Sequence, residues 1–275
     1  ALEICGDEVD NNCVNGVDEG CTSFSGCLSK DPALALYFSF NDSTATDLSG
    51  NGNNGVISGA TPVSGRIGTG FSFDGGNDYI NAGSATALDN MGAVTVTAWV
   101  YPRTCGGGNN GRIINKAAGS PIANGWVFDM GCDSIPSSLE FYVTYSGTDL
   151  YARSAANSIT LNAWNFVAVT WNGASAGNAV RLYINGIDAP ATTQNPTLSR
   201  ETDSAQSLWV GNAPALTRTF NGTIDEVLVF NRVLNSTEIS SIYNNKLCPS
   251  PATCTDADGD GYGIGCSLGA DCNDG

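Results

Sequence analysis

Short stretches in which apolar and polar residues alternate recur through the middle of the chain, and they decide which fold classes are open to it. In residues 94–100, VTVTAWV, valine and alanine alternate with threonine and tryptophan. A period of two built from β-branched and aromatic residues predicts half-buried strands. The same pattern marks residues 33–40, 70–75, 139–145, 165–171, 180–186, 208–212 and 224–231. So many strands without intervening helices predict an all-β sandwich or barrel.

Two local signals add detail to this all-β prediction. Asn185 and Gly186 stand between two apolar stretches, and both tolerate positive φ, so they predict a hairpin turn. Residues 235–245, NSTEISSIYNN, predict one short helix near the C-terminal end. Asn235 can cap this helix, and Glu238 follows three residues later, as in a capping box. The expected buried stripe of the helix is Ile239, Ile242 and Tyr243.

Both ends of the chain are acidic and differ in composition from the middle. All 11 lysines and arginines lie from Lys30 to Lys246, the segments outside them carry only acidic charge, and the net charge is −16. Such unbalanced charge repels itself unless it is solvated or neutralised. A disordered acidic tail is one interpretation, but the regular spacing and the interspersed cysteines favour bound divalent cations. Nucleic acids and anionic membranes are poor partners for a chain of this charge.

Ten cysteines and no histidine indicate disulfides rather than a zinc site, and an oxidising compartment. The glycosylation sequons at Asn41, Asn221 and Asn235 are compatible with a secreted route. No stretch of 18 apolar residues occurs, so we expect no membrane span. No signal peptide is visible, and the start at Ala1 is typical of a processed or excised product.

Several motifs in the middle of the chain carry a resemblance to a known family. They are DLSGNGNNG (47–55), GFSFDGGNDYI (70–80), VTVTAWVYP (94–102), WNFVAVTWNG (164–173), VRLYING (180–186) and FNGTIDEVLVFNRVLNSTEI (220–239). In this order and spacing they resemble a laminin-G-like domain of the concanavalin A-like lectin/glucanase group. The resemblance implies an antiparallel jelly-roll sandwich of two sheets at residues 30–247, between irregular end segments at 1–29 and 248–275. Domains of this group bind sugars, proteins or nothing, so the fold alone gives no function.

The same resemblance implies a structural calcium site in the sandwich. In this family calcium often binds where the DLSGN-type loop meets the aspartate of the GTIDEV strand. Carried over to this chain, Asp47 and Asp225 offer carboxylates. The residues that offer amide or carbonyl oxygens are Asn51, Asn53 and Gly55. Asn/Gly-rich loops suit calcium because it takes several hard oxygen ligands on flexible backbone. The alternative is that Asp47 only caps a turn.

The tail carries a sharper metal signal. Asp256, Asp258 and Asp260 have the spacing of positions 1, 3 and 5 of an EF-hand loop. Tyr262 can offer its carbonyl, whereas Ser267 replaces the bidentate glutamate at position 12. The tail resembles thrombospondin type-3 repeats, which implies that a later residue supplies the missing ligand. The candidates for it are Asp271, Asn273 and Asp274.

The head resembles the Cys/Asp-rich metal-binding repeats of microbial surface proteins. The residues that carry this resemblance are Asp7, Asp10, Asn12, Asn15, Asp18 and Glu19. Val14 stands where the family often has aspartate, and Asn15 where it has glycine. Written tail then head, the two end segments form one continuous Asp/Asn/Gly/Cys-rich module. A chain whose tail completes its own head can link end to end.

The pairing of the cysteines is only partly suggested by these segments, because sequence does not fix disulfide connectivity. The natural local pairs are Cys254 with Cys266, Cys13 with Cys21, and Cys27 with Cys248, the last of which brackets the sandwich. Cys105 and Cys132 lie in connections inside the sandwich. Cys5 and Cys272 remain. We favour a link between Cys272 of one unit and Cys5 of the next, and the alternative is a ring closed within one chain.

Catalysis is not expected. Without histidine there is no Ser/His or Cys/His dyad. Glycosidases of this fold need two carboxylates beside the bond that breaks, yet the pattern ExDxxE is absent and Glu140 stands alone in SLEFYVTY. The tryptophans that could stack sugars are Trp99, Trp126, Trp164, Trp171 and Trp209. Most of them lie inside alternating strands, which favours packing in the core.

These observations predict an extracellular or cell-surface structural or adhesive module, stiffened by calcium and disulfides and joined head to tail as a repeat or filament. Neighbouring copies of the chain are its first expected partners, and glycans or surface proteins are further ones. The alternative is a carbohydrate-binding module of a larger secreted protein or hydrolase. Calcium-dependent multimers would favour the first function, and glycan binding by a monomer the second.

Removal of calcium should lower the melting temperature and loosen the two ends before the sandwich. Their Gly/Asn-rich segments contain too little apolar surface to fold unaided, so ligand binding must order them. Limited proteolysis with and without chelator should open cleavage near residues 7–19 and 256–274. An unchanged melting curve together with unchanged cleavage would contradict this prediction.

Overall fold

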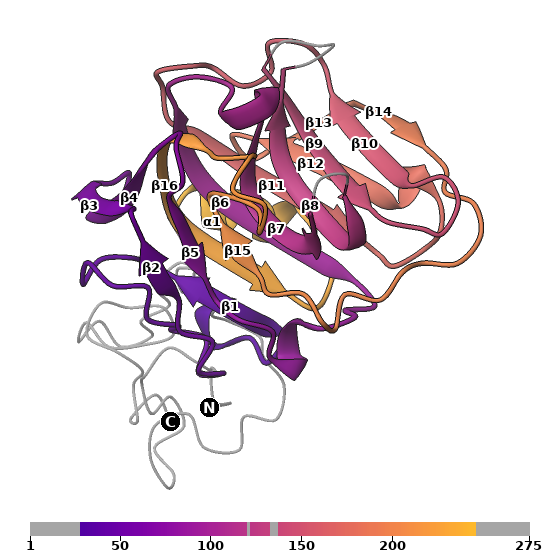
Figure 1. Cartoon of the computed structure of the whole chain (residues 1–275), viewed down its shortest axis with the longest axis horizontal. Helices are drawn as coiled ribbons and strands as arrows, with labels where there is room; N and C mark the ends of the chain where they lie inside the picture. Colours follow the sequence, from indigo (N-terminus) through magenta and orange to yellow (C-terminus); the bar gives the residue numbers. More distant parts are fainter. Residues whose placement is uncertain (1–27, 120–121, 133–136, 246–275) are drawn as a thin grey trace, which may run out of the picture. The chain divides into compact units, whose positions relative to one another are not determined.

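The structure, a computed structural model, describes residues 28–119, 122–132 and 137–245, and it divides the chain into two units. Residues 35–239 form one unit, and residues 1–34 and 240–275 form the other. In the described part, strands make up two antiparallel sheets that face each other (Figure 1). This confirms the predicted all-β sandwich with one short C-terminal helix, and the arrangement is consistent with a jelly roll.

The first sheet has the strand order β13-β12-β11-β6-β16-β4-β3, and β1 also pairs with β16. Its strands are β1 (Leu34–Phe38), β3 (Thr61–Ser64), β4 (Thr69–Asp74), β6 (Val94–Pro102), β11 (Asn165–Trp171), β12 (Val180–Ile184), β13 (Ile187–Ala189) and β16 (Asn221–Phe230).

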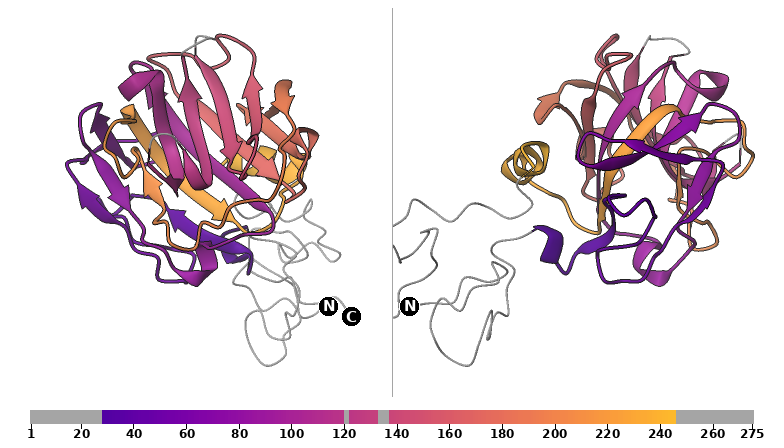
Figure 2. Two further views of the ribbon diagram at one scale, coloured as in Figure 1. Left: turned by 45° about the vertical axis from the view of Figure 1, so that its right-hand side comes forward. Right: turned by 90° about the vertical axis from the view of Figure 1, so that its left-hand side faces the viewer.

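The second sheet has the order β14-β10-β9-β8-β7-β15-β5-β2, and β7 to β10 run side by side within it (Figures 1 and 2). Its strands are β2 (Val56–Ser58), β5 (Tyr79–Asn81), β7 (Asn110–Ala118), β8 (Ala123–Gly131), β9 (Ser138–Val143), β10 (Leu150–Ser154), β14 (Ala191–Gln194) and β15 (Trp209–Val210).

Helices are short. The 3-10 helices are η1 (Leu28–Lys30), η2 (Thr86–Leu88), η3 (Gly107–Asn109) and η4 (Gly177–Ala179), and the α-helix is α1 (Ser236–Tyr243). None of the helices that the structure describes is long and apolar enough to cross a membrane.

The core lies between the two sheets and follows the predicted alternation. Every second residue of β6 from Val94 to Val100 belongs to it. From the other sheet, β8 contributes Trp126 and Phe128, which are fully buried. Alternate residues of a strand point to opposite faces, so the residues between these core positions lie on the outer face of each sheet. The alternation therefore also fixes which residues of the second sheet lie on its outer face.

Both predicted local signals are confirmed. Asn185 and Gly186 have φ of 52° and 79°, and they connect β12 to β13 as a hairpin. At α1, Asn235 Oδ1 accepts hydrogen bonds from the backbone N–H groups of Thr237 and Glu238. Glu238 Oε2 accepts the N–H of Asn235 at 2.7 Å, which completes the capping box. In the helix stripe Ile239 and Ile242 are buried and Tyr243 is partly exposed.

Two neighbouring acidic residues are buried at a bulge in β16. The pairing of β16 with β6 shifts register between Asp225 and Leu228, and Glu226 has φ of 50°, which strains a residue with a side chain. Tyr37 Oη donates to Glu226 Oε2 at 2.8 Å, and Asp225 Oδ2 accepts the N–H of Ile67 at 2.9 Å. Burial raises the pKa of Asp225 to about 6 and that of Glu226 to about 7.

The free energy of unfolding should therefore decrease as pH rises from about 5 to about 7.5. A carboxyl whose pKa is higher in the folded chain than its ordinary value stabilises the fold while it is protonated, and that stabilisation is lost as pH rises through the folded pKa. The decrease should be about 1–3 kcal/mol. Urea unfolding in the presence of chelator measures it, and Glu226→Gln should flatten the curve. The exposed change Asp188→Asn should leave the curve as it is, and a Glu226→Gln curve as steep as the parent's would contradict this assignment.

Candidate functional site

A row of charged residues crosses four strands of the second sheet. Arg112 on β7 pairs with Asp129 on β8, Asp129 with Glu140 on β9, and Glu140 with Arg153 on β10. Residues directly opposite in an antiparallel pair project from the same face. Their sequence neighbours Phe128, Leu139 and Phe141 are in the core, so this charged row lies on the outer face.

The charged row consists of two ion pairs with no net charge. Arg112 Nη1 contacts Asp129 Oδ2, and Arg153 Nε lies 2.7 Å from Glu140 Oε1. The side chains of Asp129 and Glu140 are 0% exposed and that of Arg112 is 2% exposed, and burial lowers the pKa of Arg112 to about 10. Each carboxylate is thus compensated by an arginine next to it, on the side away from the other carboxylate.

Several buried polar atoms of the charged row have no hydrogen-bond partner within the described residues. Asp129 Oδ1 and Arg112 Nε are among them, and Asn115 Oδ1 next to them on the same face is another. Buried polar groups of native proteins nearly always have a hydrogen-bond partner, so each exception calls for an explanation. Because these atoms are buried, a ligand on the outer face does not reach them.

An aromatic row runs beside the charged row, one pleat further along the strands. Successive strand pairs set its members opposite one another: Asn81, Trp209, Asn115, Val127, Tyr142, Tyr151 and Gln194. Toward one end, the rings of Tyr142 and Tyr151 lie 4.6 Å apart. Toward the other, the rings of Trp209 and Tyr79 pack at a tilt of 41° with centroids 4.3 Å apart. All four rings are partly exposed, so aromatic surface is available near both ends of the row.

The two rows are bonded to each other where β9 meets β10. Tyr142 Oη donates to Glu140 Oε2 at 2.8 Å, and the Arg153 guanidinium lies 5.1 Å from the centre of the Tyr151 ring. Burial and the nearby Glu140 carboxylate raise the pKa of Tyr151 to about 12 and also raise that of Tyr142. Both phenols therefore keep their protons at neutral pH, and the four side chains form one fixed group.

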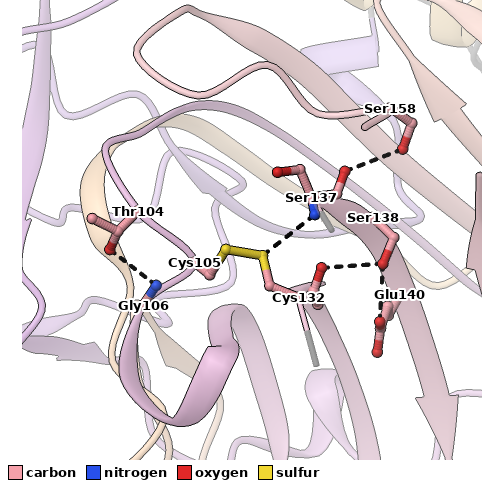
Figure 3. Close-up of a disulfide and its surroundings, with 9 residues drawn as sticks. Thr104, Cys105, Gly106, Cys132, Ser137, Ser138, Glu140 and Ser158 are labelled. Atoms are coloured by element: carbon pink, nitrogen blue, oxygen red, sulfur yellow. Dashed lines mark hydrogen bonds between the residues drawn. A yellow bond between two sulfur atoms is a disulfide. The ribbon is translucent and has the colours of Figure 1, made fainter. Parts of the chain in front are cut away.

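A disulfide lies just beyond the end of β8, the strand that carries Asp129. Cys105 and Cys132 are bonded, with their Cα atoms 5.9 Å apart, which confirms their assignment as disulfide cysteines. Ser138 Oγ, close by, donates to Gly131 O and to Glu140 Oε1, both at 3.1 Å (Figure 3). The bond ties the connection before β7 to the residue that follows β8.

The sandwich residues predicted to bind calcium lie in two different hydrogen-bonded settings. Asp47 Oδ1 accepts the N–H groups of Tyr37 and Ser49, and its Oδ2 accepts that of Asn53. Asp225 instead bonds to Ile67 and to the N–H of Glu226. Within the described residues no group of three or more His, Cys, Asp or Glu side chains is suited to hold a metal. The geometry of Asp47 fits the turn-capping alternative, and the calcium set with Asn51, Gly55 and Asp225 stays a prediction.

Most of the other predicted sites lie outside the residues that the structure describes. The metal ligands expected at residues 7–19 and 256–274 lie outside the described residues, as do Cys5, Cys13, Cys21, Cys27, Cys248, Cys254, Cys266 and Cys272. Of the sequon asparagines, Asn41 and Asn235 are exposed, whereas Asn221 lies in β16 and is partly buried. Their glycosylation stays a prediction.

Sequence reasoning missed the partner of Glu140. Glu140 has no acidic neighbour on its own strand, as predicted, but Asp129 lies opposite it on β8. Core packing is confirmed for Trp126 and Trp171. Trp99 is buried on the outer face of the first sheet against Phe166, and Trp209 is partly exposed on the outer face of the second. The alternation around Asp129 in residues 123–131 was the signal that could have located it.

The sequence profile described as the concanavalin A-like lectin/glucanases superfamily matches residues 74–240. No curated protein matches the chain. Several solved structures share the fold at low sequence identity. The binding domain of Paraclostridial Mosquitocidal Protein 1 is 18% identical, with a TM-score of 0.63 over 79% of this chain and 53% of that one.

Two further structures extend this comparison. Domain 4 of AbnA, a GH43 extracellular arabinanase from Geobacillus stearothermophilus in complex with arabinotriose, is 17% identical, with a TM-score of 0.56 over 76% of this chain and 98% of that one. The binding domain of Botulinum Neurotoxin DC in complex with SialylT is 14% identical, with a TM-score of 0.54 over 82% and 54%. The chain thus spans about half the length of the toxin domains that it matches.

Removal of one arginine from the charged row should destabilise the chain strongly. Arg112→Leu leaves the buried Asp129 without its counter-charge and facing Glu140, which should lower the free energy of unfolding by about 3–5 kcal/mol. Adding Asp129→Leu should restore most of that loss, because no unpaired charge then remains. The exposed pair of Arg181 with Asp188 provides the control, since Arg181→Leu should cost less than about 1 kcal/mol. Equal losses for the single and double changes in urea unfolding would contradict the assignment.

Proposed function

We propose that this chain, which belongs to the concanavalin A-like lectin/glucanases superfamily, is a carbohydrate-binding module whose binding surface is the outer face of the second sheet. The observation that carries the proposal is the charged row lying beside partly exposed aromatic rings on that face. The similarity to solved binding domains supports it at the level of the fold.

The chemistry of the aromatic row is complementary to a sugar. The charged row is buried, and through Glu140 and Arg153 it holds the rings of Tyr142 and Tyr151 in place. The apolar faces of sugar rings pack on aromatic side chains, as ligands do in sites lined by aromatic rings with a few fixed polar groups. Because the charged row has no net charge and the chain carries −16, the proposed ligand is uncharged or weakly charged.

The proposal includes no catalysis. Asp129 and Glu140 are two facing carboxylates, as glycoside hydrolysis requires, but each is bound to an arginine. Both members of a hydrolytic pair must reach the bond that breaks, whereas these two carboxylates are fully buried. The arrangement therefore offers no catalytic pair to a bound sugar.

This function replaces the head-to-tail filament as the leading hypothesis. The comparisons lend no support to self-association, and Cys5 and Cys272, on which it rested, lie outside the described residues. The disulfide and the arabinanase described as extracellular support a location outside the cell, on the wall or surface or as part of a larger secreted protein. Calcium, bound by the end segments, remains part of the proposal as a structural ion.

Affinity electrophoresis in gels that contain single polysaccharides tests the binding function. We expect at least one neutral polysaccharide to retard the parent protein. Tyr142→Ala should weaken this binding by about tenfold or more, because aromatic residues that anchor an interface typically contribute more than 1 kcal/mol.

Trp164→Ala is the matched control, since Trp164 is also partly exposed but packs on Tyr101 of the other sheet. It should leave retardation unchanged. No retardation by any polysaccharide, together with no binding on a glycan array, would refute the proposed function. Equal weakening of binding by both changes would show that the binding surface lies on another part of the chain.

A further inference from the structure

Lys116 is a charged residue on the side of β7 that faces the core. It pairs in register with Trp126 of β8, which belongs to the core, and residues directly opposite in an antiparallel pair project from the same face. The side chain of Lys116 is 0% exposed. Lysine is almost never fully buried unless it is paired, so the groups around its amine decide what this residue does.

The amine of Lys116 is in direct contact with a side-chain carboxyl group. Nζ lies 2.7 Å from Oδ1 of Asp89, the residue that follows η2. Nζ also donates to the main-chain oxygens of Asp203, at 3.2 Å, and of Gln206. These bonds hold a primary amine against a carboxyl group in one orientation. Two reactants fixed in this way reach effective concentrations of about 10⁵–10⁸ M.

A second carboxyl group, that of Asp203, is held beside this contact. Its Oδ1 accepts the N–H of Asn90, the residue after Asp89, at 2.5 Å, and Asn90 Oδ1 accepts the N–H of Asp203 at 3.1 Å. Asp203 is fully buried, and burial raises the pKa of its carboxyl although Arg200 Nη2 lies 3.4 Å from Oδ2. Asp203 is therefore a buried group that can take up and return a proton next to the reactive pair.

We infer that Lys116 and Asp89 become joined by an amide bond between Lys116 Nζ and Asp89 Cγ, which links β7 covalently to the connection between η2 and β6. A proton first passes from the ammonium to the Asp89 carboxylate, so that both groups are neutral. Nζ then attacks Cγ and the N–C bond forms. Asp203 carries a second proton from the nitrogen to the departing hydroxyl, the C–O bond breaks, and one water molecule leaves. This condensation needs no co-reactant, and the inference does not depend on the proposed carbohydrate-binding function.

The surroundings of the pair favour the amide over the ion pair. Burial penalises two charged groups, whereas a neutral amide avoids that cost. The single N–H of the new amide can stay bonded to Gln206 O, and Asp203 O keeps the N–H of Gln206 at 2.8 Å. The side chain of Asp89 is 17% exposed, so the released water has a route to solvent.

Intact mass spectrometry of the full chain, reduced so that no disulfide contributes, tests this inference. The folded parent protein should be lighter than its sequence requires by one water molecule. Tandem mass spectrometry of a protease digest should find this loss in a branched peptide that joins Lys116 to Asp89. That peptide distinguishes the cross-link from cyclisation of an aspartate elsewhere in the chain. A folded parent protein whose peptides carry both residues unlinked would overturn the inference.

Three variants assign the roles. Lys116→Arg keeps a positive charge but has no nucleophilic amine, so it should show the full mass and a lower melting temperature. Lys30→Arg is the matched control and should still lose the water. Asp203→Asn keeps both reactants and should slow bond formation by about a hundredfold or more, measured as the linked fraction at matched times after expression.

Circular dichroism spectra should show that each variant is folded. A loss of water that persists in Lys116→Arg would overturn the cross-link, and linkage of Asp203→Asn at the rate of the parent would overturn the role given to Asp203.

Discussion

Two carboxylates face each other across β8 and β9, and much of the outer face of the second sheet is arranged around them. Asp129 and Glu140 are fully buried and directly opposite in register, a placement that repulsion would otherwise oppose. Arg112 and Arg153 flank them on the neighbouring strands, so across the four strands each acidic residue has an arginine on its outer side. A hydrogen bond to Glu140 orients Tyr142. Contacts with the Tyr142 ring and with the Arg153 guanidinium orient Tyr151. The register of four strands thus positions the residues that we propose meet the ligand.

The fold was predictable from sequence because its core strands are periodic. β6 and β11 alternate between core and outer positions with few exceptions, and the hairpin at Asn185 and the cap at Asn235 depend on contacts within a few residues. Such local signals are legible in a single sequence. Pairing between strands is not local, and only the register tells which residue lies opposite another.

The candidate site was missed for the same reason. β7 has register shifts on both sides of the stretch from Ile114 to Lys116, and its charged and polar residues hide its period of two. β8 and β10 carry their charges as single residues in otherwise apolar or mixed stretches. Asp129, Arg112 and Arg153 are 41 residues apart at most in the sequence numbering and have no motif that links them. They form a row only after β7, β8, β9 and β10 have paired.

The disulfide between Cys105 and Cys132 makes the proposed binding face depend on the compartment in which the chain folds. It spans a sequence separation of 27 residues and ties the connection before β7, which carries Arg112, to the end of β8, which carries Asp129. In a reducing cytoplasm that link does not form. The sandwich can pair its strands there, but the connection before β7 remains untied until the chain meets an oxidant. Export would then act as a maturation step, because it would complete the face that we propose binds carbohydrate.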